Sequence, residues 1–552
     1  MSNIDKIARD HLYEFVKLDP AAATYFGLEG ATDKFGDYSP KGAQAFHDLN
    51  RTSLGQLASA EITSNADRIA KDAMYERLSL EIDKHDAGEY KRNLNVISSP
   101  IQTIRRVFDL MPRASDDDYA DISARLSKVP LAITQYKECL DLGLNDNQAA
   151  ASRQALECAK QARAYGDKSN GFFIGVSNAY QGKNQTLKDE LIKNAVVAAN
   201  EYNCLAEYLE NNYAGSTTAS DDIGAERWKL MCRTFNGITL DPAETYAWGW
   251  EELHSIEASM EQTAQKILPR ATIEEVISHL ETDPKYIIHG QDNFIRWNQE
   301  LHNNTIAALD GRHFNIPDPV KVVEAMIAPP GGAAAMYYTP PSSDFVRPGR
   351  TWYPTLGRTT FPLWTEVSTA YHEGVPGHHL QFGYITYLGE KLNAFSRTLG
   401  TVSGYLEGWA LYAERLMDEL GYLEDPVYKL GMLSAQALRA ARVVVDIGLH
   451  HQYKIPKGHK FLPPEVWNPS LAVELIHSVS GRERNFSISE VDRYLGWPAQ
   501  ATSYKVGERV WLETRQAAKK AQGSNFSLSD FHQRGFELGF VGLEQLRKEL
   551  SS

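Results

Sequence analysis

Residues 371–381 read YHEGVPGHHLQ, and this short stretch contains three histidines and one glutamate. Imidazole and carboxylate groups are typical zinc ligands. In the familiar HExxH pattern, two histidines four residues apart lie on one helical face and bind zinc, and the intervening glutamate is the general base. His372 and Glu373 fit the first half of that pattern, but residue 376 is proline. The second ligand must therefore come from a different spacing.

A regular helix could not bring the histidines of this stretch to one ion. His378 would lie about 120° around the axis and about 9 Å along it from His372, and His379 about 10.5 Å along it. Zn–N bonds of about 2.0–2.1 Å exclude both arrangements. Pro376 cannot donate a backbone hydrogen bond to the carbonyl group of His372, and Gly377 tolerates unusual backbone angles. We therefore predict that two residues loop out at Pro376–Gly377 and bring His378 to the second ligand position.

The choice between the two adjacent histidines is less constrained. A glycine directly before His378 imitates the Gly-His ending of HExGH sites, which favours His378 as the ligand. His379 remains the alternative ligand and is otherwise expected to lie beside the site or to bind substrate. An isolated histidine on a helix is usually a satisfied polar residue, but this cluster beside a Pro-Gly break favours metal binding.

A third ligand is predicted downstream, in SGYLEGWALYAERLMDEL at 403–420. Glu407 and Glu414 are seven residues apart, so both project from one helical face that is otherwise apolar. Carboxylates in apolar surroundings are costly unless they are paired or bound to a metal. We expect Glu407 to be the ligand and Glu414 to orient a ligand histidine. The alternative is an ordinary solvated helical face.

Composition limits the other classes of function. The 552-residue chain carries a net charge of −14, and no Lys/Arg cluster offers a face for nucleic acid. No stretch approaches the 18 or more apolar residues of a membrane span, and the N-terminus does not resemble a secretory signal. We therefore predict a cytoplasmic protein without nucleic-acid or membrane partners. Four dispersed cysteines are expected to be reduced: Cys139, Cys158, Cys204 and Cys232.

The pattern along the chain indicates a mainly helical protein. We predict an N-terminal helical lobe over 1–215, a polar loop near 213–224 and a second helical lobe over 225–552. Residues from about 320 to 356 are rich in Pro, Gly, Tyr and β-branched residues, which predicts a small sheet directly before the histidine stretch. The expected strands are VKVVEAMI, AAAMYY and TWYPTL, and TWYPTL is expected to be an edge strand that could pair with an extended substrate.

HEGVPGHHLQ followed by GYLEGWALYAE resembles the bacterial family catalogued as domain of unknown function 885. That family carries an HExxPGHH motif and is grouped with the gluzincin-like zinc metallopeptidases. The resemblance spans nearly the whole chain. It implies a mainly α fold, with one large helical gluzincin-like catalytic unit over 1–552 and a small antiparallel β-sheet beside a deep cleft. It also implies His372, His378 and Glu407 as ligands of one Zn²⁺, with Glu373 as the base.

The expected function is a zinc-dependent metallopeptidase that hydrolyses short peptides. The general base removes a proton from water, and donors besides zinc must stabilise the oxyanion. His450 and Tyr504, which lie in family-like stretches, are the candidate donors. Arg442 and Lys505 are candidates for binding a substrate carboxylate.

Two alternatives stay open from the sequence. One is a zinc hydrolase that acts on a non-peptide amide or ester. The other is a metal-free helical binding protein. The sequence sets neither the substrate and cleavage mode nor the oligomeric state.

Overall fold

The computed structural model describes residues 2–28, 30–328, 335–458 and 462–552, and it is mainly helical with a few short strands. This confirms the predicted fold class. Contacts divide the chain into two compact units. The first comprises Met1–Ile223 and Ser489–Pro498, and the second comprises Gly224–Ile488 and Ala499–Ser552. Among the described residues, no helix is both long and apolar enough to span a bilayer.

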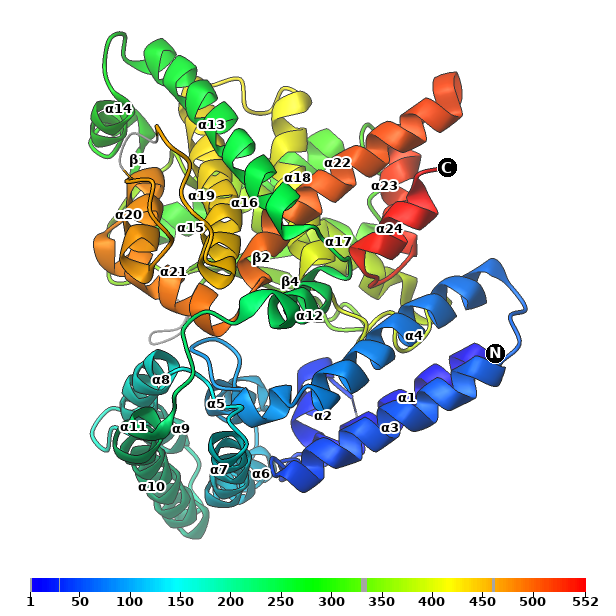
Figure 1. Ribbon diagram of the computed structural model, residues 1–552, viewed down its shortest axis with the longest axis vertical. Helices are drawn as coiled ribbons and strands as arrows, with labels where there is room; N and C mark the ends of the chain where they lie inside the picture. The colour runs from blue at the N-terminus through cyan, green and yellow to red at the C-terminus, as the bar shows by residue number, and fades with distance from the viewer. Residues whose placement is uncertain (1, 29, 329–334, 459–461) are drawn as a thin grey trace. The chain divides into compact units, whose positions relative to one another are not determined.

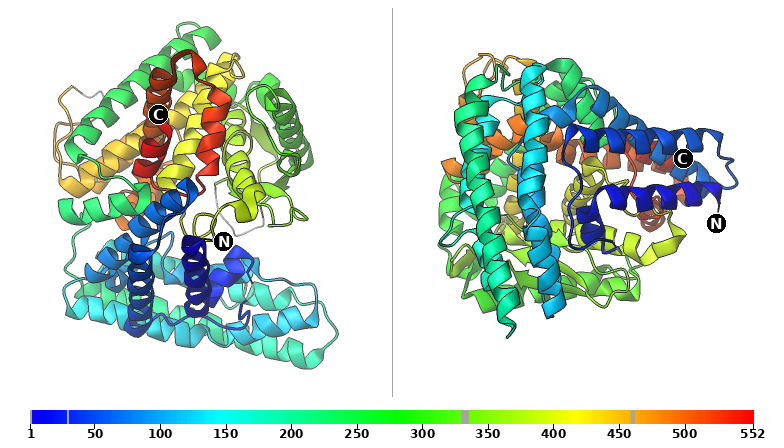
Figure 2. Two further views of the ribbon diagram at one scale, coloured as in Figure 1. Left: turned by 90° about the vertical axis from the view of Figure 1, so that its right-hand side faces the viewer. Right: turned by 90° about the horizontal axis from the view of Figure 1, so that it is seen from below.

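The first unit is built from helices and contains no described strand. Its helices are α1 (Asn3–Leu18), α2 (Pro20–Phe26), α3 (Pro40–Ser59), α4 (Asn65–Asp86), α5 (Pro100–Leu110), α6 (Asp116–Leu126), α7 (Val129–Asn145), α8 (Ser152–Tyr165), α9 (Phe172–Asn178), α10 (Gln185–Tyr208) and α11 (Ala214–Ser216). Helix α3 packs against α1 and α4, and all three are drawn in blue in Figures 1 and 2. A π-helical turn, Leu209–Tyr213, joins α10 to α11.

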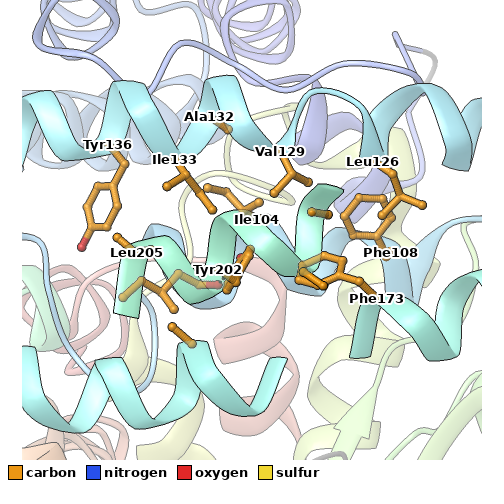
Figure 3. Close-up of a cluster of buried hydrophobic side chains, with 14 of the residues drawn as sticks. Ile104, Phe108, Leu126, Val129, Ala132, Ile133, Tyr136, Phe173, Tyr202 and Leu205 are labelled. Carbon is orange, nitrogen blue, oxygen red and sulfur yellow. Dashed lines mark hydrogen bonds between the residues drawn. The ribbon is translucent and has the colours of Figure 1, made fainter. Parts of the chain in front are cut away.

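A large apolar core holds the first unit together. Side chains from α5, α6, α7, α9 and α10 meet in it, and Phe108, Ile133 and Tyr202 are fully buried there (Figure 3). Apolar side chains that recur every three or four residues give each helix one apolar face, and the helices bury these faces by packing against one another.

The segment Ser489–Pro498 is separated by more than 250 residues from the rest of the first unit. It lies in the second half of α21 (Arg484–Gly496) and the residues after it. Arg153 forms a salt bridge with Asp492 at 3.2 Å, and the Gln154 side chain donates a hydrogen bond of 2.8 Å to the Asp492 carbonyl group. Two segments that lie far apart in the sequence therefore form the first unit together.

The second unit holds the histidine stretch. Its remaining helices are α12 (Gly224–Asn236), α13 (Pro242–Ile267), α14 (Ile273–Leu280), α15 (Gln291–Leu309), α16 (Glu366–Glu373), α17 (His378–Leu388), α18 (Ser403–Glu419), α19 (Pro426–His451), α20 (Pro469–Ser480), α22 (Ser503–Gln522), α23 (Leu528–Glu537) and α24 (Leu543–Leu550). Its main helix pairs are α13 with α19 and α18 with α22. Helix α16, which carries the first half of the histidine stretch, packs against both α18 and α19.

Two small sheets lie in the second unit. Strands β1 (Ile287–His289) and β5 (Thr360–Pro362) pair antiparallel. Strands β2 (Val323–Ile327), β3 (Tyr337–Thr339) and β4 (Gly349–Tyr353) form a sheet in the order β2-β4-β3. The β3–β4 pair is antiparallel, as predicted, and the β2–β4 pair is parallel.

The strand order corrects one prediction. TWYPTL contributes to β4, which lies between β2 and β3 and uses its hydrogen-bonding groups within the sheet. It is therefore not an edge strand and cannot pair with a substrate. The predicted strand AAAMYY begins within 329–334, which lie outside the described residues, and its last two residues open β3.

The close approach of α18 and α22 gives the first prediction. A Cβ atom at Gly408 would lie 2.4 Å from the Cα of Gly507. We expect Gly408→Ala to lower the free energy of unfolding by about 1–3 kcal/mol through overpacking, measured by denaturant titration. Gly55 lies within α3 with open space around the equivalent position. Gly55→Ala should instead be stabilising by about 1 kcal/mol from helix propensity. Similar losses in both variants would contradict the close-packing explanation.

Candidate metal centre

The histidine stretch contains an interrupted helix. Helix α16 ends at Glu373, and α17 begins at His378. The backbone N–H of Gly377 donates to the carbonyl group of Tyr371 at 3.0 Å, six residues back instead of the usual four. This bond encloses two more residues than a regular helical turn, which confirms the predicted two-residue insertion. The break as a whole is longer than predicted, because it covers 374–377.

Glycine is required at the end of this break. A Cβ atom at Gly377 would lie 2.0 Å from the carbonyl oxygen of His372, so any side chain would prevent the close backbone approach. The indole Nε1–H of Trp409, on α18, points at the carbonyl oxygens of Pro376 and Gly377 at 2.9 and 3.2 Å. Trp409 is fully buried and therefore supplies the donor that water cannot supply here.

The break brings three predicted ligands together. Nε2 of His372 lies 3.3 Å from Oε2 of Glu407, and Nε2 of His378 lies 3.5 Å from the same oxygen. The two imidazole planes are nearly perpendicular, at 85°. A tetrahedral ion with bonds of about 2.0–2.1 Å would separate its ligand atoms by about 3.3–3.4 Å. Oε2 of Glu407 is buried and has no hydrogen-bond partner among the described residues, so the spacing fits a cation better than a direct hydrogen bond.

Glu414 and Ser368 orient the first histidine. Nδ1 of His372 is 2.7 Å from Oε1 of Glu414, and the Ser368 hydroxyl group donates to the other carboxylate oxygen. This carboxylate–imidazole pair directs Nε2 of His372 towards Glu407, as in many metal sites. Ser368 was not predicted, although it lies one helical turn before His372 on the same face.

The two carboxylates favour positive charge between them. Burial would lower the pKa of His372, but interactions with Glu407 and Glu414 outweigh it and raise the pKa to about 10. Burial would raise the pKa of Glu407, but the two histidines lower it well below its ordinary value. A proton or a divalent cation at His372 therefore satisfies the same electrostatic demand.

Glu373 lies at the end of α16, directly after the first ligand histidine. Its side chain is buried, and burial raises its carboxyl pKa, while the nearby imidazoles of His378 and His372 oppose that change. A carboxyl group with a raised pKa is well suited to proton transfer near neutral pH.

His379 faces away from the three predicted ligands. Its Nε2 lies 2.8 Å from the carbonyl oxygen of Val320, and its Nδ1 lies 3.0 Å from the Tyr338 hydroxyl group. Both ring nitrogens thus have partners, and burial lowers the pKa of this imidazole to about 4. The geometry supports His378 over His379 as the second ligand.

The remaining predicted residues differ in their surroundings. The Tyr504 ring is half-buried beneath the guanidinium group of Arg442, 4.8 Å from its centroid. Lys505 is fully buried and has three partners, so its ammonium group has no hydrogen left for a substrate carboxylate. These partners are Gln436, Glu252 and Glu508. Lys505 is therefore a core residue that joins α22 to α13 and α19. His450 is fully buried near the end of α19.

A second histidine cluster lies in the first unit. His47, His85 and Asp86 also have potential ligand atoms close together. Their imidazole rings are stacked, with centroids 4.3 Å apart and an interplanar angle of 30°. In this cluster His85 is half-buried and Asp86 is exposed, and exposed acidic groups are common without a metal ion, whereas His372 and His378 are buried and Glu407 is half-buried.

The comparisons with known proteins identify a family and a fold. A family model described as "Bacterial protein of unknown function (DUF885)" matches residues 20–550. A crystal structure from Colwellia psychrerythraea, described as a putative lipoprotein, has a TM-score of 0.85 at 21% identity and covers 100% of this chain and 99% of its own. A Shewanella oneidensis structure, described as a putative lipoprotein of unknown function, has a TM-score of 0.75 at 17% identity, with 99% of each chain covered. No curated protein matches the sequence.

The contact between Trp409 and the helix break can be tested with a matched pair of variants. Trp409→Phe removes an indole N–H that bonds two buried carbonyl groups. Trp511 is equally buried, and its indole nitrogen has no hydrogen-bond partner among the described residues. We expect Trp409→Phe to lower the free energy of unfolding by about 1–3 kcal/mol more than Trp511→Phe, measured by denaturant titration. Equal losses would show that the indole N–H contributes nothing to the break.

Proposed function

The chain belongs to the DUF885 family of bacterial proteins of unknown function, and we propose that it is a zinc-dependent metallopeptidase acting on short peptides. The observation that carries this proposal is the convergence of Nε2 of His372, Nε2 of His378 and Oε2 of Glu407 at separations of 3.3 and 3.5 Å. Two histidines and one glutamate leave one tetrahedral position open, which is the ligand set of a catalytic zinc site.

Zn²⁺ would be held by His372, His378 and Glu407, and when bound it would act as a Lewis acid and lower the pKa of water at its open position. Glu373 follows His372 directly and is the proposed general base. It would accept a proton from water and then donate a proton to the leaving amine. Glu414 would hold the imidazole of His372 in the tautomer that leaves Nε2 free.

The proposed donor for the oxyanion is Tyr504. The centre of its ring lies 6.0 Å from the guanidinium carbon of Arg439, whose charge opposes the burial-driven rise in the pKa of Glu373. His450 was the other predicted donor. It lies eleven residues beyond Arg439 on α19, a rise of about 16 Å, and its side chain is fully buried. We therefore favour Tyr504 over His450 for this role.

The HExxPGHH motif and its gluzincin grouping favour peptides as substrates, and the deep cleft expected for that group stays a prediction. A zinc hydrolase of a non-peptide amide or ester would use the same ligands, so only the substrate separates it from a peptidase. A metal-free binding protein is the less favoured alternative. It would not need Glu414 and Ser368 to orient Nε2 of His372.

The cellular location also stays a proposal. We favour the cytoplasm, because the four cysteines are free thiols and three of them are buried. The two similar solved structures are described as putative lipoproteins, and a lipoprotein would not be cytoplasmic. Fractionation of the native host with an antibody against the chain would decide between the two locations.

The ligand assignment predicts distinct zinc contents for single variants. We expect the wild-type protein to contain about one zinc per chain, measured by elemental analysis after desalting. His372→Ala, His378→Ala and Glu407→Ala should each lose most of it, because each removes one of three ligands. His379→Ala is the matched control and should keep its zinc. Loss of zinc in His379→Ala with retention in His378→Ala would reverse the assignment of the second ligand.

The role of the general base predicts a separation of metal binding from turnover. Glu373→Gln keeps the size of the side chain but cannot accept a proton. We expect full zinc content and a decrease of about 10²- to 10⁴-fold in kcat on a peptide that the wild-type protein cleaves. Glu366, on the same helix, offers a matched Glu→Gln control, for which we expect a much smaller effect on kcat. Unchanged kcat in Glu373→Gln would remove Glu373 from the mechanism.

A further inference from the structure

Arg439 is a partly buried cation that the site described above does not use. It lies on α19, which packs against α16, the helix that carries His372 and Glu373. Its Nη1–H donates to the carbonyl oxygen of Ala435 on its own helix at 3.2 Å, and its Nε is buried without a hydrogen-bond partner. Within the part of the chain that the structure describes, most of its five N–H donors are therefore available.

The absence of a carboxylate partner distinguishes Arg439 from a structural arginine. Arg415, which is also partly buried, shows the structural arrangement, because it is paired with Glu508 at 2.6 Å and Glu252 at 2.9 Å. Arg439 has no such ion pair among the described residues, although its charge opposes the rise that burial causes in the pKa of Glu373 and helps to lower the pKa of Glu414. A guanidinium group in this setting is costly to bury and gains most from an anionic ligand.

The aromatic ring of Tyr504 lies beside this cation. The centre of its ring lies 6.0 Å from the guanidinium carbon of Arg439 and 4.8 Å from that of Arg442. Arginine side chains held against an aromatic ring keep their N–H groups free for ligands. A planar guanidinium group with free edges matches the two oxygens of a carboxylate.

We propose that Arg439 binds the C-terminal carboxylate of the substrate, so that the site acts on peptides with a free C-terminus. This inference rests on the proposed peptidase function and narrows its substrate class. It also replaces the predicted use of Lys505, whose ammonium group is already surrounded by partners. Arg439 would thereby set specificity, and Glu373 would remain the base.

The test compares peptides of one sequence that end in a free carboxylate or in an amide. We expect wild-type kcat/KM to be about 10- to 100-fold higher for the acid than for the amide. In Arg439→Gln this preference should fall to within about threefold, through loss of activity on the acid. Lys429→Gln is the matched control on α19, because it removes a positive charge that is paired with Asp418, and it should keep the wild-type preference.

Two outcomes would overturn the proposal. One is a wild-type protein that cleaves acid and amide equally well. The other is an equal decrease on both peptides in Arg439→Gln, which would show that Arg439 acts on Glu373 or on the fold. If Arg439→Gln does not fold, Arg439→Lys takes its place. Lysine keeps the charge but loses the two-pronged contact, so the preference should decrease without vanishing.

A binding measurement separates this proposal from the peptidase function itself. Calorimetry with the Glu373→Gln protein, as purified, should show tighter binding of the acid than of the amide. The Glu373→Gln/Arg439→Gln protein should bind both peptides equally. If the protein binds the acid more tightly than the amide but the wild type cleaves no peptide, the peptidase function is refuted and the carboxylate site is supported. Cleavage without any preference in either assay would support the peptidase and refute the role of Arg439.

Discussion

The candidate site depends on one backbone hydrogen bond that spans six residues, where a regular α-helix spans four. The bond from Gly377 to Tyr371 replaces a regular helical turn and removes the separation that six residues of straight helix would impose on two imidazoles. The imidazole rings of His372 and His378 then lie 4.9 Å apart, centroid to centroid. The contorted backbone is tolerated because glycine leaves room and because Trp409 bonds its buried carbonyl groups. The spacing of the candidate ligands therefore depends both on the local backbone geometry and on the packing of Trp409 against it.

The same region concentrates negative charge in a buried setting. Glu373, Glu407 and Glu414 come from two helices, and burial opposes ionisation of each. Interaction with His372 offsets the effect of burial on Glu407 and Glu414, whose pKa values are lowered, while the pKa of Glu373 stays raised. Three carboxyl groups around so few cationic groups form an environment that favours a positive ligand and keeps one carboxyl group ready to exchange a proton.

Much of this site could be predicted from the sequence, because helical periodicity alone fixes which residues can share a face. Local helix geometry predicted the looped turn and one shared face for Glu407 and Glu414, whereas the preference for His378 over His379 came from the glycine that precedes it. The strand order was not accessible in this way, since TWYPTL forms the centre of its sheet through pairing with distant segments. The surroundings of Lys505 and Arg439 were equally hidden, because they depend on which remote residues supply a counter-charge. Glu252 pairs with Lys505, whereas no carboxylate among the described residues pairs with Arg439.

The segment Ser489–Pro498 has a consequence for how the chain is made. Arg153 and Gln154 find part of their environment at Asp492, so the first unit lacks a component until nearly the whole polypeptide has left the ribosome. The first unit cannot reach its final form in advance of the second by simple order of synthesis. The chain passes between the two units three times, so folding of the candidate metal site in the second unit is coupled to completion of the helical core in the first.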